Sequence, residues 1–199
     1  MPSLSAGTLR IVPAGEAKWD NLQRIFGARG SAAMCQCQRY KLPAGEAFKD
    51  VPAAEREHRL RMQTQGETEE STGLVTYLGE QPVGWCAVQP RAAYGGLVRG
   101  QRVPWDGREE DKADPTVWAV TCFVTRTGYR RQGIASALAL AAVEHAHRLG
   151  ARAIEGYPIN TTAAILAEMH VGTIGMFLRA GLAEVARPTK RRVVMRREF

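Results

Sequence analysis

Residues 117–150 read VWAVTCFV, TRTGYRRQG and IASALALAAVEHAHRLG, three pieces of different composition. The first piece is almost entirely apolar and rich in β-branched and aromatic side chains, which is typical of a strand buried on both faces. The third is an alanine-rich helix in which Leu138, Ala142 and His145 recur at helical spacing and Gly150 offers a stop. Because the first N–H groups of a helix point outward and carry partial positive charge, the basic, glycine-bearing turn between strand and helix predicts a phosphate site.

The composition is that of an ordinary soluble globular protein. The chain has 199 residues, 45% of them hydrophobic and 24% charged, which suits one domain with a full core. Lys and Arg number 27 against 20 Asp and Glu, and the formal net charge of +7 favours an anionic ligand such as a phosphorylated cofactor, nucleic acid or an acidic surface. No run resembles a signal peptide or is long enough to span a bilayer, so we expect a cytoplasmic protein that does not bind membranes.

The four cysteines do not indicate a metal site. Cys86 and Cys122 lie in apolar, strand-like runs, where a small buried thiol is the ordinary interpretation. Cys35 and Cys37 form a close pair, but a zinc site needs more ligands at recognisable spacing, and the sequence offers no matching second pair. We therefore expect no metal.

Helices and strands alternate along the rest of the chain. We expect strands at residues 9–12, 74–78, 83–88 and 152–157, and a final hairpin from residues 182–186 and 193–196. We expect helices at residues 17–26, from Pro52 onward and at residues 173–180. Stretches without a clean period are residues 31–40, 65–72 and 91–115, and an irregular stretch as long as the last is often functional. The order predicts an α/β (α+β) fold with a mixed sheet.

The turn before the predicted alanine-rich helix carries a motif. Residues 130–135 read RRQGIA, which fits the pattern Arg/Gln-x-x-Gly-x-Gly/Ala that marks the acyl-CoA site of the GNAT superfamily of N-acyltransferases. Residues 129–138 as a whole resemble that family's signature, set between an apolar strand and a helix of small residues. Residues 83–85 resemble the family's third strand, and residues 176–182 resemble its last helix running into a strand.

The resemblance implies a fold and a cosubstrate. It covers about residues 9–199 and implies a single GNAT domain over residues 1–199, with an irregular insertion at about residues 91–115. The fold implied is a mixed, mostly antiparallel central sheet flanked by helices on both faces. The cosubstrate implied is acetyl-CoA, which fits the expectation of an anionic ligand.

The resemblance also implies which residues bind coenzyme A. In the family the pyrophosphate is contacted by main-chain N–H groups of the loop, which here belong to Arg131, Gln132, Gly133, Ile134, Ala135 and Ser136. Arg130 and Arg131 would supply charge. The pantetheine arm pairs like a strand with the strand before the loop, which here means Phe123, Val124 and Thr125, and one N–H there would polarise the thioester carbonyl. Family members often carry an asparagine after the next strand, and Asn160 is the candidate here.

The catalytic groups are less clearly marked. Many relatives use a tyrosine in the last helix to return a proton to the thiolate, but that position is Phe177, which has no proton to give. Tyr157 is the nearest tyrosine in a suitable place. Glu155 lies in an otherwise apolar strand, where its pKa is expected to be raised and suited to a general base; the alternative is an ion pair with an arginine. His170 and Glu168 are the other candidates for the base.

The sequence leaves more than one function open. The first is an N-acetyltransferase that moves acetyl from acetyl-CoA to a primary amine on a small molecule or on a protein lysine or N-terminus, with residues 35–40 and 91–115 in the acceptor wall. The basic net charge disfavours polycationic acceptors, but the acidic patch at residues 106–111 leaves them open. The second is a non-catalytic acyl-CoA-binding sensor or regulatory module, which Phe177 favours. Nucleic-acid binding rests on net charge alone, because the basic segment 190–197 lacks interleaved aromatics. The oligomeric state is open, with a homodimer among the options.

Overall fold

The computed structural model describes residues 8–66, 72–100, 103–160 and 166–199. Within these residues one sheet has the strand order β1-β2-β3-β4-β5-β7-β6. The strands are β1 Leu9–Pro13, β2 Leu74–Leu78, β3 Gln81–Pro90, β4 Val117–Thr125, β5 Ala153–Gly156, β6 Ala183–Thr189 and β7 Arg192–Glu198. Neighbouring strands are antiparallel except β4 and β5, which run parallel. The mixed, mostly antiparallel sheet predicted from the sequence is confirmed.

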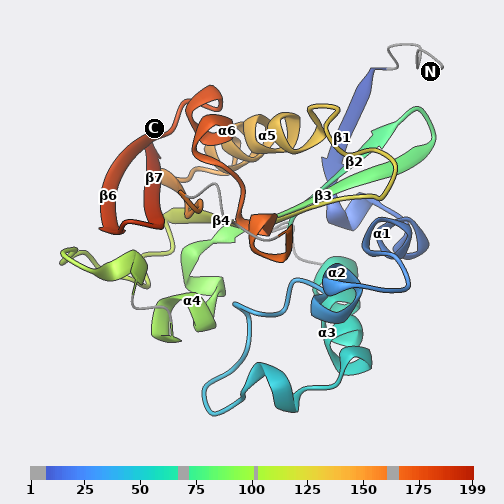
Figure 1. The fold of residues 1–199 in the computed structure, drawn as a ribbon, viewed down its shortest axis with the longest axis horizontal. Coiled ribbons are helices and arrows are strands. Elements are labelled where there is room, and N and C mark those ends of the chain that lie inside the picture. The colour runs from blue at the N-terminus through green and yellow to red at the C-terminus, as the bar shows by residue number, and fades with distance from the viewer. Residues whose placement is uncertain (1–7, 67–71, 101–102, 161–165) are drawn as a thin grey trace.

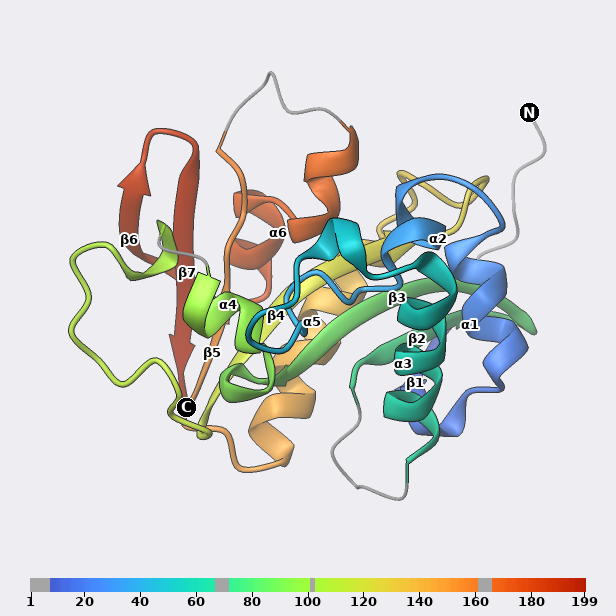
Figure 2. The same cartoon turned by 90° about the horizontal axis from the view of Figure 1, so that it is seen from below.

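Helices cover both faces of this sheet. They are α1 Trp19–Phe26, α2 Ser31–Cys35, α3 Ala53–Gln65, α4 Gly95–Gly100, α5 Ile134–Arg148 and α6 Ile174–Arg179. Short 3-10 turns lie at Ala14–Glu16, Phe48–Asp50, Arg91–Ala93, Val103–Trp105 and Leu166–Val171. Figures 1 and 2 show α5 and α6 on one face of the sheet and α1 to α4 on the other. The helices predicted at residues 17–26, after Pro52 and at residues 173–180 are therefore all present, with bounds shifted by one or two residues.

Each face of the sheet has its own apolar core. On the side of α5 and α6, a cluster that includes Val120, Leu138 and Ile154 is fully buried. On the other side α1 buries the apolar stripe predicted from its spacing, and Phe26 packs on Trp85 with ring centroids 5.8 Å apart. A sheet covered on both faces explains why the strand that opens residues 117–150 is apolar almost throughout.

Strand β4 changes its pairing half-way along its length. Its parallel pairing with β5 joins Val117 to Ala153 and ends where Val120 lies opposite Gly156, while β4 itself continues to Thr125. On the other edge, β3 and β4 shift register, because Ala87 pairs with Cys122 and the next residue of β3 pairs with Val120. Thr121 is thus an extra residue, a β-bulge, which bends a strand and re-aims its side chains. Beyond the bulge β4 leaves β5.

The segment of residues 91–115 is more ordered than its sequence predicts. It contains α4 and two 3-10 turns, and Tyr94, Leu97 and Trp105 are buried in one cluster that also includes Tyr157. The expectation of an irregular stretch is therefore wrong in part, because its few large apolar side chains share a core with residues of β4, β6 and β7. Of the connection predicted at residues 65–72, residues 67–71 lie outside the described part of the chain. No helix among the described residues is long and apolar enough to cross a membrane.

Candidate functional site

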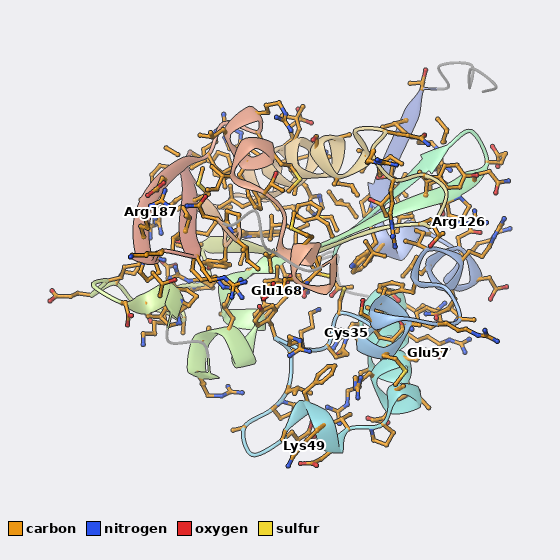
Figure 3. The ribbon with its side chains drawn as sticks, viewed as in Figure 1. Cys35, Lys49, Glu57, Arg126, Glu168 and Arg187 are labelled. Carbon is orange, nitrogen blue, oxygen red and sulfur yellow. The ribbon has the colours of Figure 1, made fainter. Side chains whose placement is uncertain are left out.

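A cavity of about 420 Å³ lies where β4 leaves β5. Its walls come from α2 and the segment after it, from Phe48, from the end of β4, from the loop before α5, and from Met169 and His170. Five of the residues predicted to contact coenzyme A line it together, namely Phe123, Val124, Thr125, Arg130 and Ala135. Figure 3 shows the side chains of this region, with Cys35 on α2 and Glu168 on the segment after β5 as landmarks.

The loop that leads into α5 exposes backbone donors. Gly128, Arg131 and Gly133 have positive φ angles of 93°, 61° and 79°, and Gly133 is the N-cap of α5 without any side-chain cap. The backbone of Arg131 adopts a left-handed conformation in this turn, which residues other than glycine rarely do. In the described part of the chain, no backbone N–H of residues 131–136 has a hydrogen-bond acceptor. Such a run of unpaired donors at a helix N-terminus suits an anion.

Positive side chains surround these donors. Arg130 lines the cavity and Arg131 is exposed, and neither has an ion-pair partner among the described residues. Arg179 at the end of α6 donates a hydrogen bond to Ser136 Oγ at 3.2 Å, which adds a cation beside the first turn of α5. A Cβ on Gly133 would meet no atom within 4 Å, so the approach to the helix N-terminus is open. The loop therefore fits a pyrophosphate group.

A second, smaller cavity of about 110 Å³ lies beside the first. Its polar lining consists of Tyr40, Thr121, Tyr157 and Arg192, and its other walls are apolar side chains. Three pairs of consecutive residues contribute one member to each cavity: 39–40, 121–122 and 170–171. The two cavities therefore lie next to each other at the bulge in β4.

Comparison with known proteins agrees with this geometry. Residues 38–172 match the sequence profile of the acetyltransferase (GNAT) family. The chain belongs to the GNAT family. The activity of that family is acyl transfer from acetyl-CoA, so the resemblance seen in residues 129–138 is confirmed. A comparison with curated protein sequences gave no match.

Solved structures share the fold. An N-acetyltransferase from Staphylococcus aureus Mu50 is 12% identical with a TM-score of 0.56, and the match covers 96% of this chain and 98% of that one. The GNAT domain of S. lividans PAT is 17% identical with a TM-score of 0.56, over 97% and 92% of the two chains. YncA from Salmonella typhimurium, whose structure contains acetyl-CoA, is 12% identical with a TM-score of 0.55, over 96% and 93%. At these identities the likeness concerns the fold.

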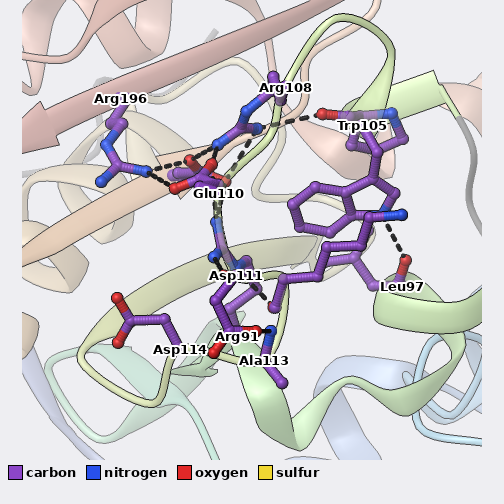
Figure 4. A network of polar contacts seen from close by, with 12 residues as sticks. Arg91, Leu97, Trp105, Arg108, Glu110, Asp111, Ala113, Asp114 and Arg196 are labelled. Atoms are coloured by element: carbon purple, nitrogen blue, oxygen red, sulfur yellow. Dashed lines mark hydrogen bonds and ion pairs between the residues drawn. The ribbon is translucent and has the colours of Figure 1, made fainter.

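Glu155 does not have the raised pKa expected of a general base. Its carboxylate is fully buried and held by Arg91 at 3.3 Å, by Arg196 at 2.7 Å and by Arg108. Burial alone would raise the pKa of Glu155, but the hydrogen bond and charge of Arg108, the hydroxyl of Tyr157 and the charge of Arg91 together lower it. The expectation was wrong because three arginines from distant segments converge on this strand. Figure 4 shows them with Glu110, a second carboxylate of the network.

Tyr157 and Phe177 lie on different sides of the sheet. The Tyr157 hydroxyl donates a hydrogen bond to Glu155 Oε2 at 2.7 Å, and its ring lines the second cavity. Burial and the neighbouring Glu155 carboxylate raise the pKa of Tyr157 well above its usual value. Phe177 is buried in the core beside Phe123, with ring centroids 6.0 Å apart. In this GNAT protein the position of the usual family tyrosine is thus occupied by a core side chain.

The remaining predicted residues are spread around the site. His170 lines the larger cavity, whereas Glu168 forms an exposed ion pair with Arg191 at 3.2 Å. Asn160 is exposed, lines neither cavity and donates its backbone N–H to the Arg191 carbonyl at 2.9 Å. The other predicted residues do not line the cavity and lie in the loop and the first turn of α5, in sequence beside Arg130 and Ala135, which do line it; they are Arg131, Gln132, Gly133, Ile134 and Ser136. Among the described residues, no group of His, Cys, Asp or Glu side chains could hold a metal ion.

Sequence reasoning missed three polar residues of the second cavity. Thr121 is hidden in an apolar strand, and only its position at the bulge brings its side chain to the cavity. Tyr40 lay inside the segment expected in the acceptor wall but was not singled out. Arg192 belongs to the basic segment 190–197, in which nothing in the sequence marks it apart from the other arginines. No local pattern distinguishes these residues, since each depends on which strand or segment lies opposite.

Proposed function

We propose that this chain transfers an acetyl group from acetyl-CoA to a primary amine by direct attack of the amine. One observation carries the proposal: the cavity at the divergence of β4 and β5 is bordered both by residues 123–125 of β4 and by the loop that leads into α5. A strand edge and a phosphate-binding turn at the two ends of one cavity suit a long cofactor arm with a pyrophosphate. The neighbouring second cavity gives the amine a place to bind.

The donor half is built from backbone. Acetyl-CoA supplies the activated acyl group as a thioester. The N–H groups of residues 131–136 donate to phosphate oxygens, and Arg130 and Arg131 add charge. The backbone of Phe123, Val124 and Thr125 pairs with the pantetheine amides, and one N–H of this strip polarises the thioester carbonyl and stabilises the charge that develops on it. Asn160 remains a predicted contact of coenzyme A.

The proposed base is His170. An amine attacks only as the neutral form, so a group must accept a proton from the ammonium, directly or through water. Of the three candidates from the sequence, His170 is the one that lines the larger cavity, and a neutral imidazole nitrogen can accept a proton. Glu155 is a poor base because its lowered pKa means that it holds a proton weakly. Glu168 is engaged with Arg191 at the surface.

Tyr157 stays the predicted proton donor to the departing thiolate, and Glu155 is proposed to orient its hydroxyl rather than to act as base. Their hydrogen bond of 2.7 Å fixes the phenol at the second cavity. Tyr40 is a second candidate for the donor, because it lines the same cavity and its pKa is raised by burial. In the described part of the chain the Tyr40 hydroxyl has no hydrogen-bond partner, so its proton is not committed elsewhere.

The test is an assay for free thiol with acetyl-CoA and a mixed set of primary amines. Release of thiol that depends on an amine, with an acetylated amine as product, supports the proposal. Tight binding of acetyl-CoA without turnover on any amine would instead support the alternative, a non-catalytic sensor of acyl-CoA. Lysine-containing peptides in the same assay test whether the acceptor is a protein.

A further inference from the structure

We propose that the acceptor carries a carboxylate as well as the reacting amine, and that Arg192 in the second cavity binds this carboxylate. The substrate class is a small amino acid with an apolar body. The inference rests on the proposed function, since it names the acceptor of the same reaction. It is drawn from the charges and walls of the second cavity.

Arg192 differs from three other arginines of the β6–β7 hairpin in lacking a carboxylate partner. In the hairpin of β6 and β7, Arg187 pairs with Glu184 at 2.6 Å, Arg191 with Glu168 at 3.2 Å and Arg196 with Glu155 at 2.7 Å. Arg192 is half-buried and lines the cavity, and within the described residues no acidic side chain lies in ion-pair range of it. A partly buried cation without an anion is costly, which favours a ligand that brings one.

Among the described residues, the rest of the cavity lining carries no negative charge to oppose an anion. Its other polar groups are the hydroxyls of Tyr40, Thr121 and Tyr157. Glu155 lies behind Tyr157, where Arg91, Arg108 and Arg196 neutralise it. A polyamine or an aminoglycoside would therefore find no carboxylate in this cavity.

The apolar walls of the cavity indicate that the ligand has a hydrocarbon side chain. Leu97, Pro104, Val171 and Val194 line the cavity around the polar groups. The charge of Arg192 also acts on Tyr40, since it opposes the effect of burial on the pKa of Tyr40. A hydrocarbon side chain against these walls, with its carboxylate on Arg192, leaves the amine free to face the bulge where the two cavities lie next to each other.

The experiment compares amines with and without a carboxylate. L-leucine is paired with isoamylamine and L-phenylalanine with phenethylamine, each with acetyl-CoA, in wild type, Arg192→Met and Arg191→Met. Arg192→Met is expected to lower kcat/KM for the two amino acids by about tenfold to a hundredfold, mainly through KM, because a charge-assisted hydrogen bond is lost. It should change kcat/KM for the two simple amines by less than about twofold. Arg191→Met, which removes a surface cation paired with Glu168, should change neither class.

Two results would overturn the inference while leaving acetyl transfer intact. One is wild-type preference for the simple amines over the amino acids. The other is an equal loss for both classes in Arg192→Met, which would indicate a merely structural arginine. If no amine of any kind is acetylated, the proposed function fails, and calorimetric titration of L-leucine into the protein with CoA then decides the site. Binding that Arg192→Met abolishes supports it, and no binding overturns it.

Discussion

The two halves of the proposed site, one for the acetyl donor and one for the amine acceptor, are built in different ways. The donor half lies almost entirely in one continuous stretch, from Phe123 in β4 through the loop to Ser136 in α5. The acceptor half takes Tyr40, Thr121, Tyr157 and Arg192 from four separate segments. The donor half uses backbone groups and glycines at fixed spacing, whereas the acceptor half uses side chains that only the tertiary fold brings together. A sequence motif can therefore predict the cofactor site, whereas no motif predicts the acceptor site.

The largest effect is expected from a change in the donor half. Gly133→Glu places bulk and negative charge at the N-cap of α5 and strains a residue with a φ of 79°. We expect the binding of CoA to fall below detection in calorimetry, with the circular dichroism spectrum of the fold retained. The matched control is Gly150→Glu at the other end of the same helix, where φ is 80° and a Cβ also meets no atom within 4 Å. Normal CoA binding by Gly133→Glu would show that the loop is not the phosphate site.

The second-largest effect is expected from replacing the proposed general base. His170→Gln should lower kcat by about a hundredfold and remove the loss of activity at acidic pH that a protonated imidazole causes. Acetyl-CoA affinity should change little. Glu168→Gln is the control, because that side chain pairs with Arg191 at the surface. An unaltered pH–rate profile in His170→Gln would remove this residue from the role of base.

A third change tests how much the buried ion-pair network beside the acceptor cavity stabilises the protein. Glu155→Gln leaves buried arginines without their counter-charge and should destabilise the protein by about 3 kcal/mol at neutral pH in urea unfolding. Because the folded-state pKa of Glu155 is lowered, its contribution is complete above the unfolded-state pKa and is lost as pH falls through the folded-state value. The difference between the two proteins should therefore shrink in acid. Glu184→Gln, which removes an exposed pair, should cost less than about 1 kcal/mol. Equal losses in both variants would contradict a special role for the buried network.

The smallest effect separates the two tyrosines of the acceptor half. Tyr157→Phe should lower kcat by about tenfold if its hydroxyl returns the proton to the thiolate, while KM for acetyl-CoA stays unchanged. Tyr40→Phe is the comparison, since it removes a hydroxyl from the same cavity. A loss of kcat confined to Tyr40→Phe would transfer the role of proton donor to Tyr40.

Much of the fold could be predicted because its signals are local. The apolar run of β4, the small-residue helix α5 and the hairpins each depend on neighbours within a few residues. The pairing of Glu155 with Arg91, Arg108 and Arg196 could not be predicted, because it depends on the insertion and the last strand meeting behind β5. The sequence allowed an ion pair as the alternative for Glu155, but it did not indicate which arginines would supply it.

The bulge at Thr121 has a consequence for the alternation of side chains. Before the bulge, the even-numbered residues Trp118 and Val120 face α5. After the bulge the odd-numbered Phe123 faces α5. Thr121 and Cys122 consequently face the same side, one in each cavity. Removing Thr121 would restore strict alternation and leave Val120, Cys122 and Phe123 on their present faces, but the second cavity would lose its hydroxyl from this strand. One extra residue thus places two consecutive side chains on the same face and gives the two cavities a common wall.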